Sequence, residues 1–303
     1  MQIAMVGLGR MGMNMAKRLL QGGHEVVAYN RTSKKTDQIA AEGAVAAYSL
    51  KEVVENLTKP RVVWIMLPAG AVVDDYLNQF KDLLSPGDIL IDGGNTYYRD
   101  DIRRAELLAE KEINLVDAGV SGGIWGLKTG YCLMIGGEEE TYQYLKPAFK
   151  TLAPKEGYLY CGEVGAGHFL KMIHNGIEYG MMQAYGEGFD ILEASPYSES
   201  LNYADIAHLW NQGSVVRSWL LELAEAAFSK DKKLSDTKGY VEDSGEGRWT
   251  VQEAIDTGVS APVIALSLMR RLRSRKKDSF ADRVVAALRR EFGGHSLAES
   301  NKP

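Results

Sequence analysis

A glycine-rich turn near residue 7 constrains the fold of this chain more than any other feature. Residues 2–6, apolar after Gln2, predict a short buried strand, and residues 13–20 have the spacing of a helix. Between them lies a G-x-G-x-x-G sequence, whose glycines let a backbone turn approach the pyrophosphate of a dinucleotide. The free N–H groups at the helix start would face the same anion. We therefore predict a dinucleotide-binding turn at Gly7-Leu8-Gly9-Arg10-Met11-Gly12.

Apolar and helical segments alternate along the rest of the first half. Near-continuous apolar runs are typical of parallel strands covered on both faces, and the alternation predicts a doubly wound α/β sheet. Ligands in such sheets bind just beyond the carboxyl ends of the strands. The predicted strands are residues 25–29, 61–68, 88–92, 113–118, 131–137 and 157–162. The loops expected to reach cofactor and substrate are Leu67-Pro68, Gly93-Gly94-Asn95 and Ser121-Gly122-Gly123.

The end of the second predicted strand bears on the choice of cofactor. An NAD enzyme usually places an acidic residue there to bind the ribose 2′-hydroxyl. This chain has Asn30, Arg31 and Thr32 instead, and an amide, a guanidinium and a hydroxyl suit a 2′-phosphate. The sequence therefore favours NADP. If Arg31 only stacks on the adenine, NAD is usable as well.

Helical periodicity replaces this alternation from residue 165 onward. We predict a Rossmann-type dinucleotide-binding domain over residues 1–163 and an all-α domain for substrate binding and oligomerisation over residues 164–303, ending in a C-terminal tail. The expected helices cover residues 165–194, 202–212, 215–230, 249–257, 262–275 and 279–291. A polar loop at 230–247 interrupts them, and long loops inside compact domains are often functional.

The first of these helices carries an unusual polar face. Lys171, His174, Asn175 and Glu178 stand at i, i+3, i+4 and i+7, so they share one side of the helix. One interpretation is a solvated face of an amphipathic helix. The other is a reaction site, because the face combines a base, an imidazole, an amide and an acid, where solvated faces usually repeat Lys and Glu.

Composition excludes several classes of protein. The net charge of −5 does not indicate a general nucleic-acid-binding surface. The sequence contains no run of 18 apolar residues, the length needed to cross a membrane. Two cysteines do not form a disulfide framework, so we expect a cytoplasmic protein. His, Cys and carboxylate residues do not cluster at ligand spacing, so we expect no metal.

These motifs together resemble the 6-phosphogluconate dehydrogenase family, in its short bacterial form within the β-hydroxyacid dehydrogenase superfamily. The most specific element is Lys171-Met172-Ile173-His174-Asn175-Gly176-Ile177-Glu178-Tyr179. The resemblance implies oxidative decarboxylation of 6-phosphogluconate to ribulose 5-phosphate and CO2, in the pentose phosphate pathway, with NADP or NAD. It also implies a homodimer or larger homo-oligomer whose C-terminal tail contributes to the site of a neighbouring subunit.

The resemblance assigns roles to particular residues. Lys171 matches the general base at the 3-hydroxyl, and Glu178 matches the acid that protonates C1 of the enediol. The substrate and carboxylate contacts match Asn95, Ser121, Gly122, Gly123, His174 and Asn175. The phosphate contacts match Tyr179, Arg271 and, from a neighbouring subunit, Arg289 and His295. Cofactor contacts match residues 7–12, Asn30, Arg31, Thr32, Leu67, Pro68 and Asn95.

One position departs from the family pattern. Where the long form has a phosphate-binding lysine in the loop before its glycine-basic-tryptophan segment, this chain has Ser244, and Arg248 nearby is a candidate replacement for the charge. Two other functions compete with the principal one: a β-hydroxyacid dehydrogenase that does not decarboxylate and binds no phosphate, and a non-catalytic dinucleotide sensor. The second leaves the polar helix face unexplained.

Overall fold

The computed structural model describes residues 1–293 in backbone and residues 1–291 in side chains. The predicted phosphate ligand His295 lies outside this range. The chain divides into two compact units, Met1–Gly176 and a second that begins at Ile177. Each unit is described by itself below.

The first unit is built on one eight-stranded sheet of order β3-β2-β1-β4-β5-β6-β7-β8. Strands β1 to β6 are parallel, whereas β7 pairs antiparallel with β6 and parallel with β8. The reversal of strand order beside β1 is the point at which doubly wound sheets bind nucleotides. The strands are β1 (Gln2–Val6), β2 (Glu25–Tyr29), β3 (Val45–Ala47), β4 (Val62–Ile65), β5 (Ile89–Asp92), β6 (Asn114–Ser121), β7 (Cys132–Gly136) and β8 (Tyr158–Gly162).

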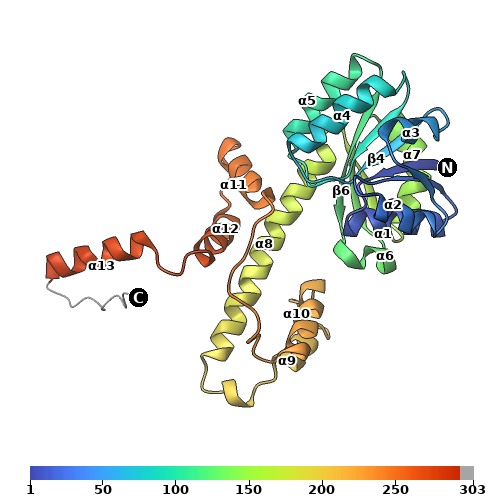
Figure 1. Ribbon diagram of the computed structural model, residues 1–303. Helices are drawn as coiled ribbons and strands as arrows, with labels where there is room; N and C mark the ends of the chain where they lie inside the picture. Colours follow the sequence, from blue (N-terminus) through green and yellow to red (C-terminus); the bar gives the residue numbers. More distant parts are fainter. Residues whose placement is uncertain (294–303) are drawn as a thin grey trace. The chain divides into compact units, whose positions relative to one another are not determined.

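Helices cover both faces of this sheet and bury a separate apolar core on each (Figure 1). One core joins the sheet to α1 (Arg10–Gln21), α2 (Ser33–Ala40) and α7 (Glu139–Leu152), with the short α6 (Gly126–Thr129) packed on α1. The other joins it to α3 (Leu50–Glu55), α4 (Ala71–Leu83) and α5 (Tyr98–Ala109). The predicted doubly wound fold is therefore confirmed.

The second unit is helical, as predicted. Its first helix, α8 (Ala166–Glu193), starts in the first unit and continues without a break into the second. The others are α9 (Tyr203–Trp210), α10 (Trp219–Lys230), α11 (Glu246–Asp256), α12 (Pro262–Ser274) and α13 (Phe280–Gly293).

Local chemistry explains where several of these helices begin. The Asn202 and Ser218 side chains accept hydrogen bonds from backbone N–H groups of the first turns of α9 and α10, and Pro262 opens α12. Residues 231–245 contain no helix or strand, which agrees with the predicted polar loop. Within the described chain, we find no helix both long and apolar enough to span a membrane.

Candidate active site

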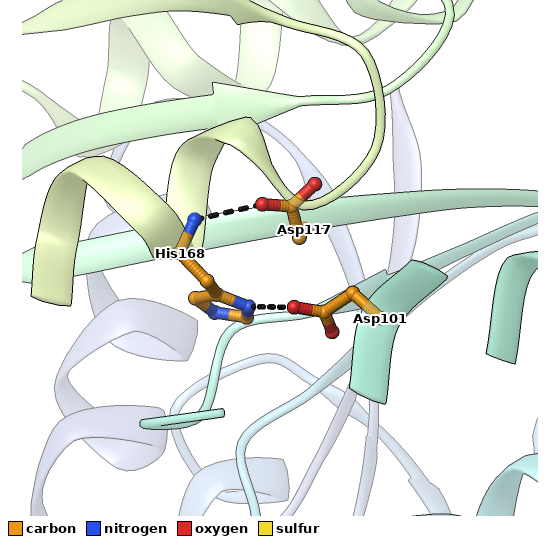
Figure 2. A group of neighbouring side chains, drawn as sticks. All are labelled: Asp101, Asp117 and His168. Atoms are coloured by element: carbon orange, nitrogen blue, oxygen red, sulfur yellow. Dashed lines mark hydrogen bonds and ion pairs between the residues drawn. The ribbon is translucent and has the colours of Figure 1, made fainter. Parts of the chain in front are cut away.

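The start of α8 is fixed to strand β6 by a buried carboxylate. Asp117 accepts hydrogen bonds from the backbone N–H groups of Gly165 and His168, each at 2.7 Å, and Figure 2 shows the one from His168. A carboxylate at this place satisfies donors that a helix start leaves unpaired and interacts favourably with the helix dipole. Asp117 thus caps α8 from another element, 48 and 51 residues away in sequence.

Close backbone contact sets the position of Lys171. A Cβ on Gly119, two residues after Asp117 on the same face of β6, would lie 2.6 Å from Lys171 Cβ and 2.8 Å from Gly167 O. A Cβ on Gly167 would lie 2.4 Å from Met134 O. Only glycine at these two positions lets α8 approach the sheet so closely. This close approach explains why α8 has glycine at residue 167, although a glycine inside a helix costs about 1 kcal/mol.

The first residues of the predicted polar face of α8 are buried rather than solvated. Lys171 is 6% exposed and Asn175 8% exposed, and Lys171 Nζ donates to Asn175 Oδ1 at 2.6 Å. His174 Nδ1 lies 3.0 Å from the same oxygen. Burial of an amine with an amide partner is the environment of a reactive lysine rather than of a surface one. Glu178 follows seven residues after Lys171 on the same helix and is half-buried.

The glycine turn has the geometry that a dinucleotide requires. Gly7 has φ +96°, and a Cβ there would lie 2.5 Å from Met66 O. A Cβ on Gly12 would lie 2.0 Å from Gly7 O, so α1 packs directly on the turn. A Cβ on Gly9 would meet nothing within 4 Å, so the backbone at Gly9 borders open space at the start of α1. These residues therefore fit a bound pyrophosphate.

Asn30 has a role inside the protein that sequence reasoning missed. Its Oδ1 accepts from Leu8 N at 2.9 Å, and its Nδ2 donates to Thr32 O at 3.1 Å. The amide therefore joins the glycine turn to the end of β2. Arg31 and Thr32 are exposed at the same strand end. No acidic side chain stands at residues 30–32 to receive a ribose 2′-hydroxyl.

The loop after β5 presents Asn95 on a rigid turn. Asp92 Oδ1 accepts from Gly94 N at 3.0 Å, and Asp92 Oδ2 accepts from Thr96 Oγ1 at 2.7 Å. A Cβ on Gly94 would lie 2.6 Å from Leu67 O, so this loop packs against the loop after β4. Asn95 is exposed between these fixed neighbours. The structure thus brings together the predicted loops at residues 67–68 and 93–95.

The third predicted loop begins where β6 ends. Gly122 and Gly123 have φ +137° and +54°, a backbone conformation that favours glycine, and they follow Ser121 directly. A short helical turn, Gly123–Trp125, continues the loop. Its Ile124 carbonyl accepts a hydrogen bond from Asn14 of α1 at 3.2 Å.

Two of the residues predicted to bind the substrate phosphate lie in contact in the second unit. The Arg271 guanidinium carbon lies 3.4 Å from the centre of the Tyr179 ring, and Ser244 N donates to Tyr179 Oη at 3.2 Å. A Cβ on Gly247 would lie 2.4 Å from Tyr179 Cε2, so this glycine is needed for the ring position. Arg289 is exposed on α13.

Arg248, the candidate replacement for the charge of the family's loop lysine, is paired with an acidic neighbour. Its Nε and one terminal nitrogen each donate to Asp243 at 3.0 Å, and Arg275 donates to the same carboxylate at 2.6 Å. These hydrogen bonds, that from Arg248 above all, lower the pKa of Asp243 to about 2. Two guanidiniums share this one carboxylate, so a positive charge remains at this place and Arg248 stays a candidate for the charge that Ser244 does not supply.

A cluster of Asp101, Asp117 and His168 has ligand atoms within 4.8 Å of one another, a spacing at which a metal can bind. Here both Asp117 oxygens accept backbone N–H groups, and His168 Nδ1 lies 2.7 Å from Asp101 Oδ2 (Figure 2). Against the effect of burial, the neighbouring carboxylates raise the pKa of His168 to about 10 and keep its ring protonated at neutral pH, so we describe the cluster as hydrogen-bonded ion pairs. Sequence reasoning missed it, although Asp117 interrupts an apolar strand.

A nucleotide-binding sheet joined to a long helix with a buried lysine at its start defines a nicotinamide-dependent dehydrogenase. Residues 2–163 match the NAD binding domain of 6-phosphogluconate dehydrogenase, and residues 167–300 match the 6-phosphogluconate dehydrogenase C-terminal domain. The chain belongs to the 6-phosphogluconate dehydrogenase family.

The similarity to known proteins extends over nearly the whole chain. A Bacillus subtilis protein named, provisionally, a 6-phosphogluconate dehydrogenase is 49% identical over 98% of this chain and 99% of its own. A Haloferax volcanii protein named 6-phosphogluconate dehydrogenase, NAD(+)-dependent, decarboxylating, is 40% identical over 99% of this chain and 100% of its own. A solved Plasmodium falciparum 6-phosphogluconate dehydrogenase, described with NADP+ and with 6-phosphogluconate, has a TM-score of 0.83 at 28% identity, covering 100% of this chain and 67% of its own.

Proposed function

We infer that this protein oxidises 6-phospho-D-gluconate with a nicotinamide dinucleotide and releases CO2, forming ribulose 5-phosphate. Family membership over both halves supports this reaction, as does the name of the full-length Haloferax relative. The observation that carries the inference is Lys171, buried over Gly119 with its Nζ 2.6 Å from Asn175 Oδ1. A buried amine in this position can take a proton from a substrate hydroxyl and return it.

Lys171 serves the oxygen at C3 in both halves of the reaction. Bound nicotinamide supplies the acceptor for the hydride that leaves C3. As that hydride leaves, Lys171 acts as the general base and takes the proton of the 3-hydroxyl, and a C3 carbonyl forms. The resulting 3-keto acid loses CO2 by cleavage of its C1–C2 bond. Protonated Lys171 returns its proton to the C3 oxygen, so the electron pair ends in an enediol.

Glu178 completes the reaction at carbon. The enediol becomes a ketose when a proton reaches its terminal carbon and a hydroxyl proton is released. Glu178 lies two helical turns from Lys171 on the same face of α8, and its half-buried carboxyl group can donate that proton. The two residues thus divide the work, with Lys171 at oxygen and Glu178 at carbon.

Specificity for a phosphorylated substrate rests on Tyr179 and Arg271. The contact between the guanidinium and the ring and the hydrogen bond from Ser244 N hold both groups in one place. We assign them to the substrate phosphate, together with Arg289 and His295 of a neighbouring subunit. Asn95, Ser121, Gly122, Gly123, His174 and Asn175 are assigned to the hydroxyl and carboxylate groups of the sugar acid.

For the cofactor we propose NADP as the preferred dinucleotide. The supporting observation is that Arg31 and Thr32 are exposed at the end of β2, without an acidic residue between residues 30 and 32. NAD is the competitor to measure, because the Haloferax relative is named NAD(+)-dependent. Arg31→Ala tests the assignment. We expect it to raise the KM for NADP roughly tenfold while leaving the KM for NAD little changed.

A homodimer or larger assembly is supported by the surface of the second unit. Large apolar side chains there are more exposed than in a stable monomer, with Val215 fully exposed and Ile191 71% exposed. An apolar cavity of about 530 Å³ lies in the same unit, lined in part by Met182, Phe189 and Phe228. Sedimentation equilibrium tests the proposal, and a monomer at working concentration would contradict it.

Substitutions of the two proton-transfer residues test the reaction. Lys171→Ala should abolish reduction of the nicotinamide with 6-phosphogluconate. Glu178→Ala should still allow oxidation but slow ketose formation, and near-normal turnover of that variant would remove Glu178 from the mechanism. Inhibition by inorganic phosphate separates this function from a β-hydroxyacid dehydrogenase without a phosphate site. Cofactor binding without turnover would indicate a sensor instead.

A further inference from the structure

A continuous set of buried charges runs through the first unit behind the proposed reaction site. His168 Nδ1 lies 2.7 Å from Asp101 Oδ2, and Asp101 Oδ1 lies 4.0 Å from an Arg104 terminal nitrogen. That nitrogen donates to Asp92 Oδ2 at 3.2 Å. All four side chains are at most 1% exposed. We call His168, Asp101, Arg104 and Asp92 the buried charge chain.

Each end of the buried charge chain holds one segment that carries a proposed site residue. At one end Asp92 binds Gly94 N and Thr96 Oγ1, the two neighbours of Asn95. At the other end His168 stands three residues before Lys171, on the turn of α8 that Asp117 caps. Residues three apart in a helix are neighbours on its surface. The buried charge chain therefore extends from the Asn95 loop to the first turn of α8, the helix that carries Lys171.

Stability alone does not explain why these charges are buried. Replacing a buried ion-pair network by apolar residues of similar volume is often neutral or stabilising, because desolvation offsets the Coulomb attraction. His168 Nε2 and Asp101 Oδ1 also lack a hydrogen-bond partner among the described residues. Burial favours neutral imidazole, but the neighbouring carboxylates, Asp101 foremost among them, together outweigh burial and raise the pKa of His168 to about 10. The charged His168 imidazole is thus buried, at a cost in desolvation, between the segments that carry Asn95 and Lys171.

We propose that His168 is a positioning residue, which through Asp101 fixes the first turn of α8 so that Lys171 stays over Gly119. The inference rests on the proposed function for the role of Lys171. His168 does not touch substrate or cofactor. It acts through the helix turn on which Lys171 stands and through the link to the Asn95 loop. Loss of this link shifts Lys171 relative to the substrate, and a shift near 1 Å costs about 10²-fold in rate.

Two variants of His168 separate positioning from packing. His168→Leu fills the space but removes the bond to Asp101, and we expect kcat to fall by about 10²-fold. The nucleotide Kd should stay unchanged, since the glycine turn is elsewhere in the unit. His168→Asn places an N–H donor near the position of Nδ1, and should recover a large part of kcat. If the Leu variant keeps wild-type kcat, or if Asn rescues nothing, the proposal is overturned.

A matched control comes from the other end of β5. Asp88 is 1% exposed, and Arg61 donates to it at 3.0 Å, at the edge of the sheet opposite the site. Asp88→Asn should lower stability but leave kcat unchanged, because this ion pair holds no site residue. A fall in kcat equal to that of His168→Leu would mean that any buried ion pair matters equally, and would overturn the proposal.

Hydrogen exchange tests the positioning role without turnover. We expect the amides of residues 165–171 to exchange at least about tenfold faster in His168→Leu than in the wild type, since a hydrogen bond between charged groups is lost. Residues in α1 should be unaffected. Unchanged exchange over 165–171 overturns the proposal even if the wild type is active. Faster exchange in His168→Leu, together with a wild type that does not oxidise 6-phosphogluconate, would instead support the positioning role and refute the proposed function.

Discussion

Substituting Gly119 by alanine perturbs the position of Lys171 with very little chemical change. The added Cβ would lie 2.6 Å from Lys171 Cβ and 2.8 Å from Gly167 O. Ordinary van der Waals contact begins near 3.4 Å, so α8 must retreat by 3.4 − 2.6 = 0.8 Å or more at this point. Gly167 blocks the alternative of tilting the helix, because it is itself in contact with the sheet.

The size of the effect follows from this displacement. Overpacking of this kind costs about 1–3 kcal/mol of folding free energy, and a misplacement near 1 Å costs about 10²-fold in rate. We therefore expect kcat with 6-phosphogluconate to fall by about 10²-fold, with an unchanged nucleotide Kd. Steady-state kinetics, calorimetric titration with the nucleotide and urea unfolding measure the three quantities.

A control substitution separates displacement of Lys171 from general loss of stability. A Cβ on Gly22, at the end of α1, would lie 2.3 Å from Thr151 Cγ2, and its φ of −82° suits alanine. Gly22→Ala should lose stability comparably while keeping wild-type kcat. The account of Lys171 is refuted if Gly119→Ala is destabilised yet fully active, or if both variants lose activity in parallel.

Three further outcomes are expected. Burial lowers the pKa of His168, but the neighbouring carboxylates, Asp101 foremost, together raise it from 6.5 to about 10. The contribution of His168 to stability is therefore fully present below pH 6.5 and is lost as pH rises through about 10; urea unfolding across this range should show a flatter dependence for His168→Asn. Gly247→Ala, which presses on the Tyr179 ring, should raise the KM for 6-phosphogluconate roughly tenfold and not that for nucleotide. Asn30→Ala removes the acceptor of Leu8 N and should weaken nucleotide binding roughly fivefold by calorimetry, and an unchanged Kd would contradict the role given to Asn30.

Periodic features of the sequence predicted most of the fold. Strands buried on both faces read as apolar runs, and the helices of the second unit have clear periodicity, so these elements were predicted within a few residues. Strand β3 was missed, because Val45–Ala47 is three residues long and lies at the sheet edge. The reversed direction of β7 and β8 is set by tertiary packing and leaves no local pattern.

Features that depend on distant contacts escaped prediction. Asp117 stands alone in an apolar strand, a sign of a buried polar group, but its partners Gly165 and His168 are far along the chain. The sharing of Asp243 by Arg248 and Arg275 was also not predicted, because Arg275 is 32 residues from Asp243 along the chain. By contrast, the i, i+3, i+4, i+7 face of α8 was readable, because a single helix sets that geometry.

The central claim is that Lys171 and Glu178 couple oxidation to loss of CO2. Its most direct test measures reduced nicotinamide and CO2 together when purified protein is mixed with 6-phosphogluconate and NADP or NAD. We predict equal amounts of the two products from the wild type, and neither product from Lys171→Ala. Reduced nicotinamide without CO2, or no reaction of the wild type with either cofactor, would contradict the account.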